Sequence, residues 1–365
     1  MTIFNPHMVA DFSKRYLTNV HLESFLKRLN PEIFNQSIAG YSVENRPIYR
    51  LDFGSGSFKI LLWSQMHGNE TTTTKAVIDL LNELNSNLNS NWLSIFSFTF
   101  LPLLNPDGAE NYTRVNANQV DLNRDSIELS QPESRVLREI IEEVKPNLAL
   151  NMHDQRTIFA AGITKNPATL SFLAPSYNES REINTVRTYA MQLIAMMHNG
   201  LKEVTSLNIG RFDDSFNVNC IGDMFTHLGT PTILFEAGFA KNDYQRHTAT
   251  KWVEQALMYL FDGIIKQSYQ IFSVEDYMKI PQNHKNFVDL IIYNFTTTNS
   301  QYKHLQELPI IFKECVRENL VVFEPTIDLE AAPSYQFAHY ILNANNQLIN
   351  TQNDVDLLLK DLVVS

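Results

Sequence analysis

Apolar residues along the chain follow two alternating patterns. Short, mainly apolar runs at 60–63, 148–152 and 232–235 are typical of strands buried on both faces of a sheet. Between these runs, residues 71–85 and 132–145 carry apolar side chains at the three- and four-residue spacing of one helix face. The pattern therefore predicts strands that alternate with helices.

Two further elements are predicted from local signals. Residues 46–63 read as two strands around a Gly-Ser turn. Residues 180–204 read as a long helix, with Ser180 as its N-cap and Glu182 in its first turn.

Alternation of strands and helices indicates an α/β fold, a sheet covered by helices on both faces. In such sheets, ligands bind at the carboxyl ends of the strands. Three separate predicted strands end on or near His67, His153 and Glu236. We therefore expect these three side chains to meet at one edge of the sheet.

Composition narrows the class of protein. The 365 residues, 44% hydrophobic, are enough for one large domain and a smaller one. A net charge of −11 without long charged blocks does not favour nucleic-acid binding, and peptide or small-molecule substrates are expected instead. No apolar run is long enough to span a membrane and residues 1–17 do not resemble an export signal, so a cytoplasmic location is predicted.

Cysteine content limits the kind of metal site. Cys220 and Cys315 are too few for a disulfide framework or a cysteine-based metal site, so a metal must use histidine and carboxylate ligands. His67 and Glu70, three residues apart after a strand, can converge on Zn²⁺, and His153 is the natural third ligand. Asp154 or Asn151 is expected to support a ligand from outside the metal shell.

The same His-x-x-Glu spacing occurs at His304 and Glu307, but no apolar strand leads into it. We interpret this second pair as a solvated helix face. Between the two ligand segments, Asn123 and Arg124 offer the planar donors that a substrate carboxylate needs. Arg114 adds a second cation nearby, although a single arginine on an acidic protein is often only a surface charge.

Taken in order, the segments RPIYRL, HGNE, NPDG, TRVNANQVDLNRD, LNMHD and PTILFEAG resemble the motifs of the zinc carboxypeptidases of the carboxypeptidase A-like family. The resemblance covers about residues 38 to 265. It implies an α/β/α sandwich around a mixed sheet, with zinc held by the side chains matching the family ligands, His67, Glu70 and His153. It further implies that Arg114 polarises the scissile carbonyl, that Asn123 and Arg124 grip the terminal carboxylate, and that Glu236 is the general base.

The chemistry of these residues agrees with that assignment. Zinc lowers the pKa of a bound water, and Glu236 can take the proton of that water and pass it to the leaving amine. The alternative for Glu236 is a structural one, a carboxylate that caps the helix after its strand.

The chain also departs from the family pattern. No tyrosine occurs from Ala190 to Asp243, where the family places a tyrosine that covers the substrate, and the gap from Glu70 to His153 is short, which suggests a more open cleft. For the substrate side chain, Ile221 would favour apolar groups and Asp223 basic ones. The sequence leaves both open.

The predicted division of the chain is a zinc carboxypeptidase-like domain at 1–270 and a small α+β or mostly β appendage at 271–365. The appendage could shape the cleft, bind a partner or support an oligomer, and the oligomeric state is undetermined.

Three functions follow. The first is a zinc hydrolase that removes the C-terminal residue of a peptide. The second keeps the metal chemistry but acts as an aspartoacylase-like deacylase of acyl-amino acids or as an amidase of cell-wall peptides. The third is a non-catalytic binding module, against which the complete set of ligands, arginines and Glu236 argues.

Overall fold

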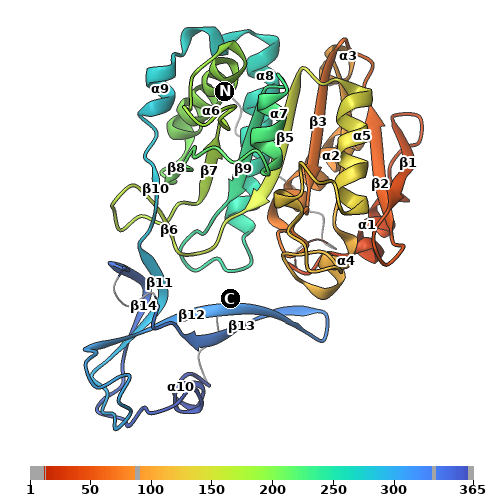
Figure 1. Cartoon of the computed structure of the whole chain (residues 1–365). Coiled ribbons are helices and arrows are strands. Elements are labelled where there is room, and N and C mark those ends of the chain that lie inside the picture. The colour runs from red at the N-terminus through yellow and green to blue at the C-terminus, as the bar shows by residue number, and fades with distance from the viewer. Residues whose placement is uncertain (1–11, 13, 87–90, 331–333, 361–365) are drawn as a thin grey trace.

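The computed structural model describes residues 12, 14–86, 91–330 and 334–360. Within these residues, eight strands form one mixed sheet (Figure 1), in the spatial order β1-β2-β4-β3-β5-β9-β7-β8. The strands are β1 (Phe34–Tyr41), β2 (Pro47–Phe53), β3 (Phe58–Ser64), β4 (Phe96–Leu101), β5 (Leu148–Asp154), β7 (Leu170–Leu173), β8 (Ile209–Arg211) and β9 (Thr232–Ala237).

The centre of the sheet is parallel, and antiparallel pairs flank it on both sides, since β7 also pairs antiparallel with β9. Strands β4, β3, β5 and β9 run in the same direction, whereas β1 and β2 form an antiparallel hairpin and β2 pairs antiparallel with β4. The two strands predicted around the Gly-Ser turn at 46–63 are present as β2 and β3. They do not pair with each other, because β4 lies between them and β3 is buried inside the sheet.

Helices cover both faces of the sheet. One face packs against α2 (Thr72–Ser86), α6 (Thr185–Val204) and α8 (His247–Ile265), and the other against α5 (Pro132–Val144) and α7 (Ile221–His227). Alternate residues of β3 enter the two cores, with Leu62 in the first and Trp63 in the second. This explains the continuous apolar run of β3 and confirms the predicted α/β/α sandwich.

The long helix α6 begins later than its sequence suggested. Asn184 is the N-cap, and its side-chain oxygen accepts a hydrogen bond of 2.9 Å from the backbone N–H of Arg187. Ser180 and Glu182 lie before the helix, so the predicted cap was wrong by four residues. The remaining short helices of this part are α1 (Asn19–Leu26), α3 (Trp92–Ile95), α4 (Pro106–Asn111), η2 (Leu122–Arg124), η3 (Ser268–Ile271) and α9 (Val274–Met278).

The C-terminal part forms a second sheet in the order β13-β12-β11-β14, with one helix beside it. Its elements are β11 (Phe287–Tyr293), β12 (Glu307–Arg317), β13 (Leu320–Ile327), β14 (Phe337–Asn343) and α10 (Gln352–Leu359). The elements just before this sheet pack on the larger, N-terminal part of the chain. Helix α9 contacts α6, and β10 (Asn283–Lys285) pairs with β6 (Phe159–Ala161). The division at residue 270 stays a prediction.

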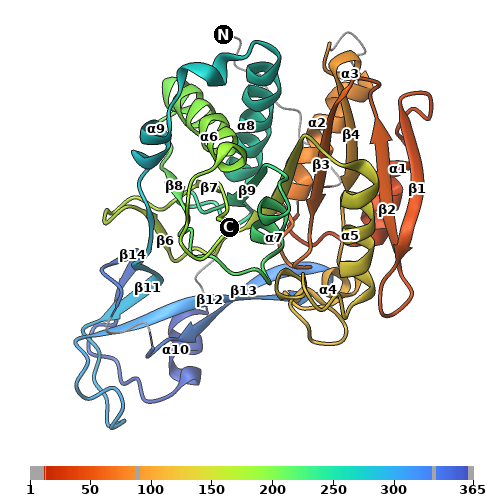
Figure 2. The ribbon, with the colours of Figure 1, turned by 45° about the horizontal axis from the view of Figure 1, so that its top comes forward.

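The second sheet lies beneath the carboxyl edge of the large sheet, and its β12–β13 hairpin reaches toward α4 (Figures 1 and 2). Glu314 of β12 accepts hydrogen bonds from Arg15 at 2.6 Å and from the hydroxyl of Tyr112 at 2.7 Å. Tyr244 donates to Asp289 of β11 at 2.7 Å. These buried contacts fix the appendage against the larger part.

Among the described residues, no helix combines the length and apolar character that crossing a membrane requires. Residues 1–11 and 13, on which the prediction about an export signal mainly rests, lie outside the described part of the chain. The cytoplasmic location therefore stays a prediction.

Candidate metal centre

The three predicted ligands come from two neighbouring strand ends. His67 and Glu70 lie in the loop between β3 and α2, and His153 lies near the end of β5, the strand paired with β3. The loop can turn here because Gly68 packs directly on the backbone of α4, where a Cβ atom would approach Gly108 to 2.0 Å. A larger residue at 68 would push the loop away and move both ligands.

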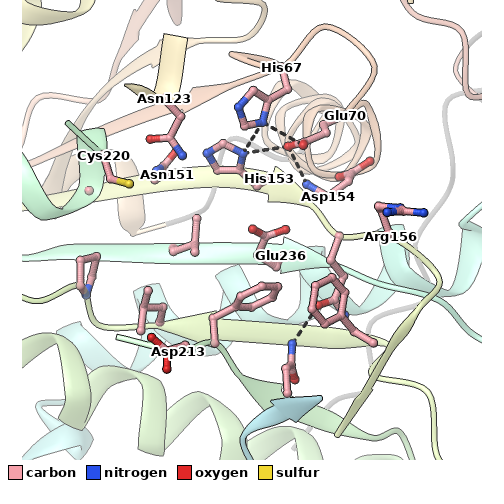
Figure 3. Close-up of a pocket in the computed structure, with 18 of the residues that line it drawn as sticks. His67, Glu70, Asn123, Asn151, His153, Asp154, Arg156, Asp213, Cys220 and Glu236 are labelled. Carbon is pink, nitrogen blue, oxygen red and sulfur yellow. Dashed lines mark hydrogen bonds and ion pairs between the residues drawn. The ribbon is translucent and has the colours of Figure 1, made fainter. Parts of the chain in front are cut away.

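The ligand atoms of these residues converge (Figure 3). The Nδ1 atoms of His67 and His153 are 3.1 Å apart, and the two carboxylate oxygens of Glu70 lie 2.8 Å from the first and 2.7 Å from the second. All three side chains are largely buried. Among the described residues, these three form the group of histidine, cysteine and acidic side chains whose ligand atoms lie close enough together to hold a metal ion.

This arrangement fits a zinc ion. Ligand atoms about 2.0 to 2.2 Å from a tetrahedral zinc are about 3.3 to 3.6 Å from one another, so the ligand atoms, now 2.7 to 3.1 Å apart, would separate slightly around the ion. Two imidazole Nδ1 atoms that face each other at 3.1 Å cannot both be satisfied as acceptors without a shared cation or proton. Three protein ligands also leave the fourth position for water or substrate.

Asp121 orients His67 from the side opposite the ligand atom. The Nε2 atom of His67 lies 3.0 Å from Oδ1 of Asp121, a carboxylate–histidine arrangement that fixes the ring and its tautomer. Although partial burial opposes ionisation, the pKa of Asp121 is held well below its usual range by His67 and Arg114. Asp121 was not among the residues predicted from the sequence, although it stands two residues before Asn123 in the segment DLNR.

The supporting role expected of Asp154 or Asn151 takes a different form. The carboxylate of Asp154 accepts from the first backbone amides of α2, at 2.8 Å from Thr72 and 3.2 Å from Thr73. Its own backbone N–H donates to Glu70 at 3.1 Å. Asn151 is buried beside the cavity, and its side-chain oxygen has no hydrogen-bond partner among the described residues. Asp154 thus anchors the start of α2 and the ligand Glu70 rather than a histidine.

Glu236 lies next to the ligands on the adjoining strand. It is the direct partner of His153 in the parallel pairing of β5 and β9. Burial, together with the negative charges of Glu70 and Asp154, raises its pKa well above the ordinary value of a carboxyl group. The helix-cap alternative is wrong, because Asp243 accepts the first amides of α8, from His247 at 3.0 Å and from Thr248.

The three other predicted site residues border the same cavity, which has a volume of about 600 Å³. Arg114 donates to Glu70 at 3.2 Å and to Asp121 at 3.0 Å. Asn123 accepts from the backbone N–H of Ile221 at 3.0 Å, which leaves its amide N–H₂ available. Arg124 is exposed, and its guanidinium donates to the backbone oxygen of Asn123 at 2.6 Å.

Only one of the two residues considered for side-chain preference borders the cavity. Ile221 is buried in the second core, whereas Gly222 and Asp223 border the cavity. Burial raises the pKa of Asp223 to about 6. No tyrosine is among the described residues that border the cavity. Phe159 and Phe212, with ring centroids 5.1 Å apart, supply its aromatic surface instead.

The second His-x-x-Glu pair lies far from this arrangement. His304 lies in a turn and Glu307 begins β12, and both are exposed. The pair is solvated, as predicted, but it is not on a helix. No metal-site geometry is found at this pair among the described residues.

Comparison with known proteins gives the same picture. The family model described as zinc carboxypeptidase matches residues 22–212, which are 191 of the 365 residues. Carboxypeptidase 2 of Trichophyton tonsurans is 32% identical over 117 residues, or 30% of this chain and 21% of that protein. The chain thus spans about a fifth of the length of the curated relatives it matches.

Solved structures resemble the larger part of the chain. The metallo-carboxypeptidase of Burkholderia cenocepacia has a TM-score of 0.55 and 14% identity, over 70% of this chain and 71% of the other. Carboxypeptidase A of Helicoverpa armigera has a TM-score of 0.52 and 19% identity, over 71% and 75%. At such identities the likeness shows the fold alone.

Proposed function

Because this chain belongs to the zinc carboxypeptidase family, we propose that it is a zinc-dependent hydrolase that removes the C-terminal residue of a peptide. One observation carries the proposal. The converging ligands His67, Glu70 and His153, the adjacent Glu236 and the pair Asn123 and Arg124 all border one cavity.

Zinc, when bound, supplies Lewis-acid chemistry that makes a water nucleophilic near neutral pH and polarises the scissile carbonyl. The side chains of the protein bind the substrate, transfer the proton and stabilise the developing charge. Asn123 and Arg124 hold the terminal carboxylate, so that the last peptide bond lies over the metal centre. A carboxylate oxygen of Glu236 receives the proton of the attacking water and delivers it to the leaving nitrogen. Arg114 places a positive charge beside the carbonyl oxygen.

The position of Asp223 extends the proposal to the released residue. A buried carboxyl at the far wall of the cavity favours a basic side chain on that residue over an apolar one. The apolar alternative, Ile221, is buried in the second core rather than in the wall of the cavity, which supports this preference.

A deacylase or amidase of short substrates is the second candidate, and one observation favours it. Residues 311–314 of β12 border a cavity that adjoins the metal centre, so the C-terminal sheet limits the space for a long peptide on the acyl side. A non-catalytic binding module has no use for a carboxylate beside three metal ligands, and we do not propose it.

A substrate series tests the proposal. Purified, zinc-loaded protein is incubated with free-acid peptides of two to eight residues, with their C-terminal amides and with N-acyl amino acids, and the released amino acid is measured. Release from free acids of all lengths that is lost with a chelator supports a carboxypeptidase. Release only from the shortest substrates supports the second candidate, and no release from any of them contradicts both.

A further inference from the structure

A second cavity of about 340 Å³ adjoins the metal centre. Glu70 and Arg114 border both cavities, whereas Asn123 and Arg124 border only the first. The metal centre therefore lies between the two spaces. A substrate held by its terminal carboxylate at Asn123 and Arg124 would place its acyl side, the part before the scissile bond, in the second cavity.

Five basic residues border this second cavity. They come from the N-terminal segment, the loops after α4 and β5, the N-cap of α8 and strand β12, and they are Arg15, Arg114, Arg156, Arg246 and Lys313. Four acidic residues also border it, namely Glu70, Asp154, Asp289 and Glu314.

Each of the four acidic residues already has partners. Glu70 belongs to the metal ligands, and Asp154 holds the first amides of α2. Asp289 accepts from the hydroxyl of Tyr244 and, at 2.8 Å, from the backbone N–H of Phe312. Glu314 accepts from Arg15 and Tyr112, as described above. The acids are thus occupied by fixed partners.

The basic residues, in contrast, have donors to spare. Arg246 is only 1% exposed, and its Nη2 donates to the backbone oxygen of Gln155 at 3.1 Å. Its Nε and Nη1 atoms have no hydrogen-bond partner among the described residues, and its guanidinium lies over the ring of Phe239, 5.9 Å from the centroid. A buried charged donor without an acceptor is costly, and an anion in the cavity would relieve that cost.

Two further cations are open to solvent beside the cavity. Arg156 and Lys313 are exposed, and the side chain of neither makes a hydrogen bond or ion pair with another described residue. Lys313 comes from the C-terminal sheet, where its neighbour Glu314 is anchored to the larger part by Arg15 and Tyr112. The strand that carries Lys313 is therefore fixed in place beside the cavity.

We propose that the second cavity binds a carboxylate on the acyl side of the scissile bond, so that the preferred substrates are short peptides with an acidic residue before the released one. This inference rests on the proposed function. It also gives the C-terminal sheet a role, because Lys313 of β12 supplies part of the positive charge and the strand closes that end of the cleft.

The carboxylate has two chemical sources, and the substrates distinguish them. Peptides Ac-Glu-X, Ac-Gln-X and Ac-Lys-X share the same released residue X and differ in the charge of the preceding side chain. A γ-linked glutamyl-X peptide instead presents the free α-carboxylate of its glutamate. We expect kcat/KM for one of the two carboxylate-bearing peptides to exceed that of Ac-Gln-X by about tenfold or more, because the cavity is built from charged donors.

Variants locate the effect. Lys313→Ala and Arg156→Ala should each lower the ratio of the acidic to the Gln peptide by about threefold, and Lys313→Glu should favour Ac-Lys-X. Arg317→Ala is the matched control, since Arg317 is an exposed cation of the same strand that pairs with Glu324 outside both cavities. It should leave the ratio unchanged. These residues are exposed, so the variants avoid the folding risk of changing Arg246.

A binding measurement makes the test independent of turnover. Calorimetry with N-acetyl-glutamate and N-acetyl-glutamine should show about tenfold tighter binding of the first, and Lys313→Glu should remove the difference. Equal kcat/KM for the acidic and Gln peptides, with both cleaved, would overturn this inference and leave the proposed function intact. Absence of cleavage, with equal binding of both ligands, would overturn both.

Discussion

His153 and Glu236 face each other directly across two parallel strands, as register partners of β5 and β9. Successive side chains of a strand alternate between faces, so this register brings both residues to the same side of the sheet edge. A slip by one residue would turn one of them into the opposite helix layer. The strand pairing, rather than a flexible loop, thus sets the position of the proposed base beside a metal ligand.

This relationship predicts a separation of metal binding from catalysis. Glu236→Gln keeps the size of the side chain but removes its ability to accept a proton. Turnover should fall by about 10²- to 10⁴-fold, while zinc content by elemental analysis and the melting temperature stay as in the wild type. A variant that keeps its activity would show that Glu236 is not the base.

Zinc affinity should depend on Asp121 although it is not a ligand. Asp121→Asn weakens the hydrogen bond to Nε2 of His67 and should reduce zinc affinity by about 10- to 100-fold in a competition with a chelator. His153→Ala should lose most of the metal, because it removes a ligand. His304→Ala changes an exposed histidine outside the metal centre and is the control, so this variant should bind zinc like the wild type.

Much of this arrangement could be predicted from the sequence. The buried strands and the helical periods of α2 and α5 are local patterns, and they placed His67, His153 and Glu236 at one edge. Asp121 was missed because its partner His67 lies 54 residues earlier, and no local pattern reports such a contact.

Other features could not be predicted because the sequence allows more than one local solution or because they join distant segments. The start of α6 was placed at Ser180, but the side chain of Asn184 makes the capping hydrogen bond, so one capping residue prevailed over another. The order of the strands could not be predicted, since β4 lies between β2 and β3 although only a short turn connects these two in the sequence. The second cavity could not be foreseen, since it needs Arg246 and β12 from distant parts of the chain.

Recognition of a free terminal carboxylate should depend on Arg124. Arg124→Ala removes a charged donor from the cavity and should reduce kcat/KM for a free-acid peptide by roughly 30- to 4,000-fold, the equivalent of about 2 to 5 kcal/mol. The rate on the C-terminal amide of the same peptide should be low already and barely change. A similar loss on both substrates would indicate misfolding, and rapid cleavage of the amide by the wild type would contradict the proposed exopeptidase.

Preference for a basic released residue should rise with pH. Since burial raises the pKa of Asp223 to about 6, its carboxyl is mostly neutral at pH 5 and mostly ionised at pH 7. The ratio of kcat/KM for a C-terminal Lys over a C-terminal Leu should therefore increase between these values, while the lysine itself stays charged. Asp223→Asn should make the ratio low and independent of pH. A ratio that is flat in the wild type would remove Asp223 from the specificity wall.

Stability should depend on pH through Glu254, a buried carboxyl of α8 far from the proposed chemistry. Burial and the nearby Asp79 and Glu83 raise its pKa to about 8, whereas the unfolded chain has the ordinary value near 4.5. Between these two values the folded state binds the extra proton, so the free energy of unfolding should fall as pH rises from about 4.5 to 8 and level off above.

The variant Glu254→Gln removes that dependence. Relative to the wild type, its free energy of unfolding should increase from pH 5 to pH 9 by an amount on the order of a few kcal/mol, because each pKa unit corresponds to about 1.4 kcal/mol. Urea unfolding at pH 5, 7 and 9 measures it. Glu139→Gln, on the exposed face of α5, is the control and should follow the wild type at each pH. If the two variants show the same pH profile, Glu254 is ionised in the folded protein, and a partner for its charge must lie nearby.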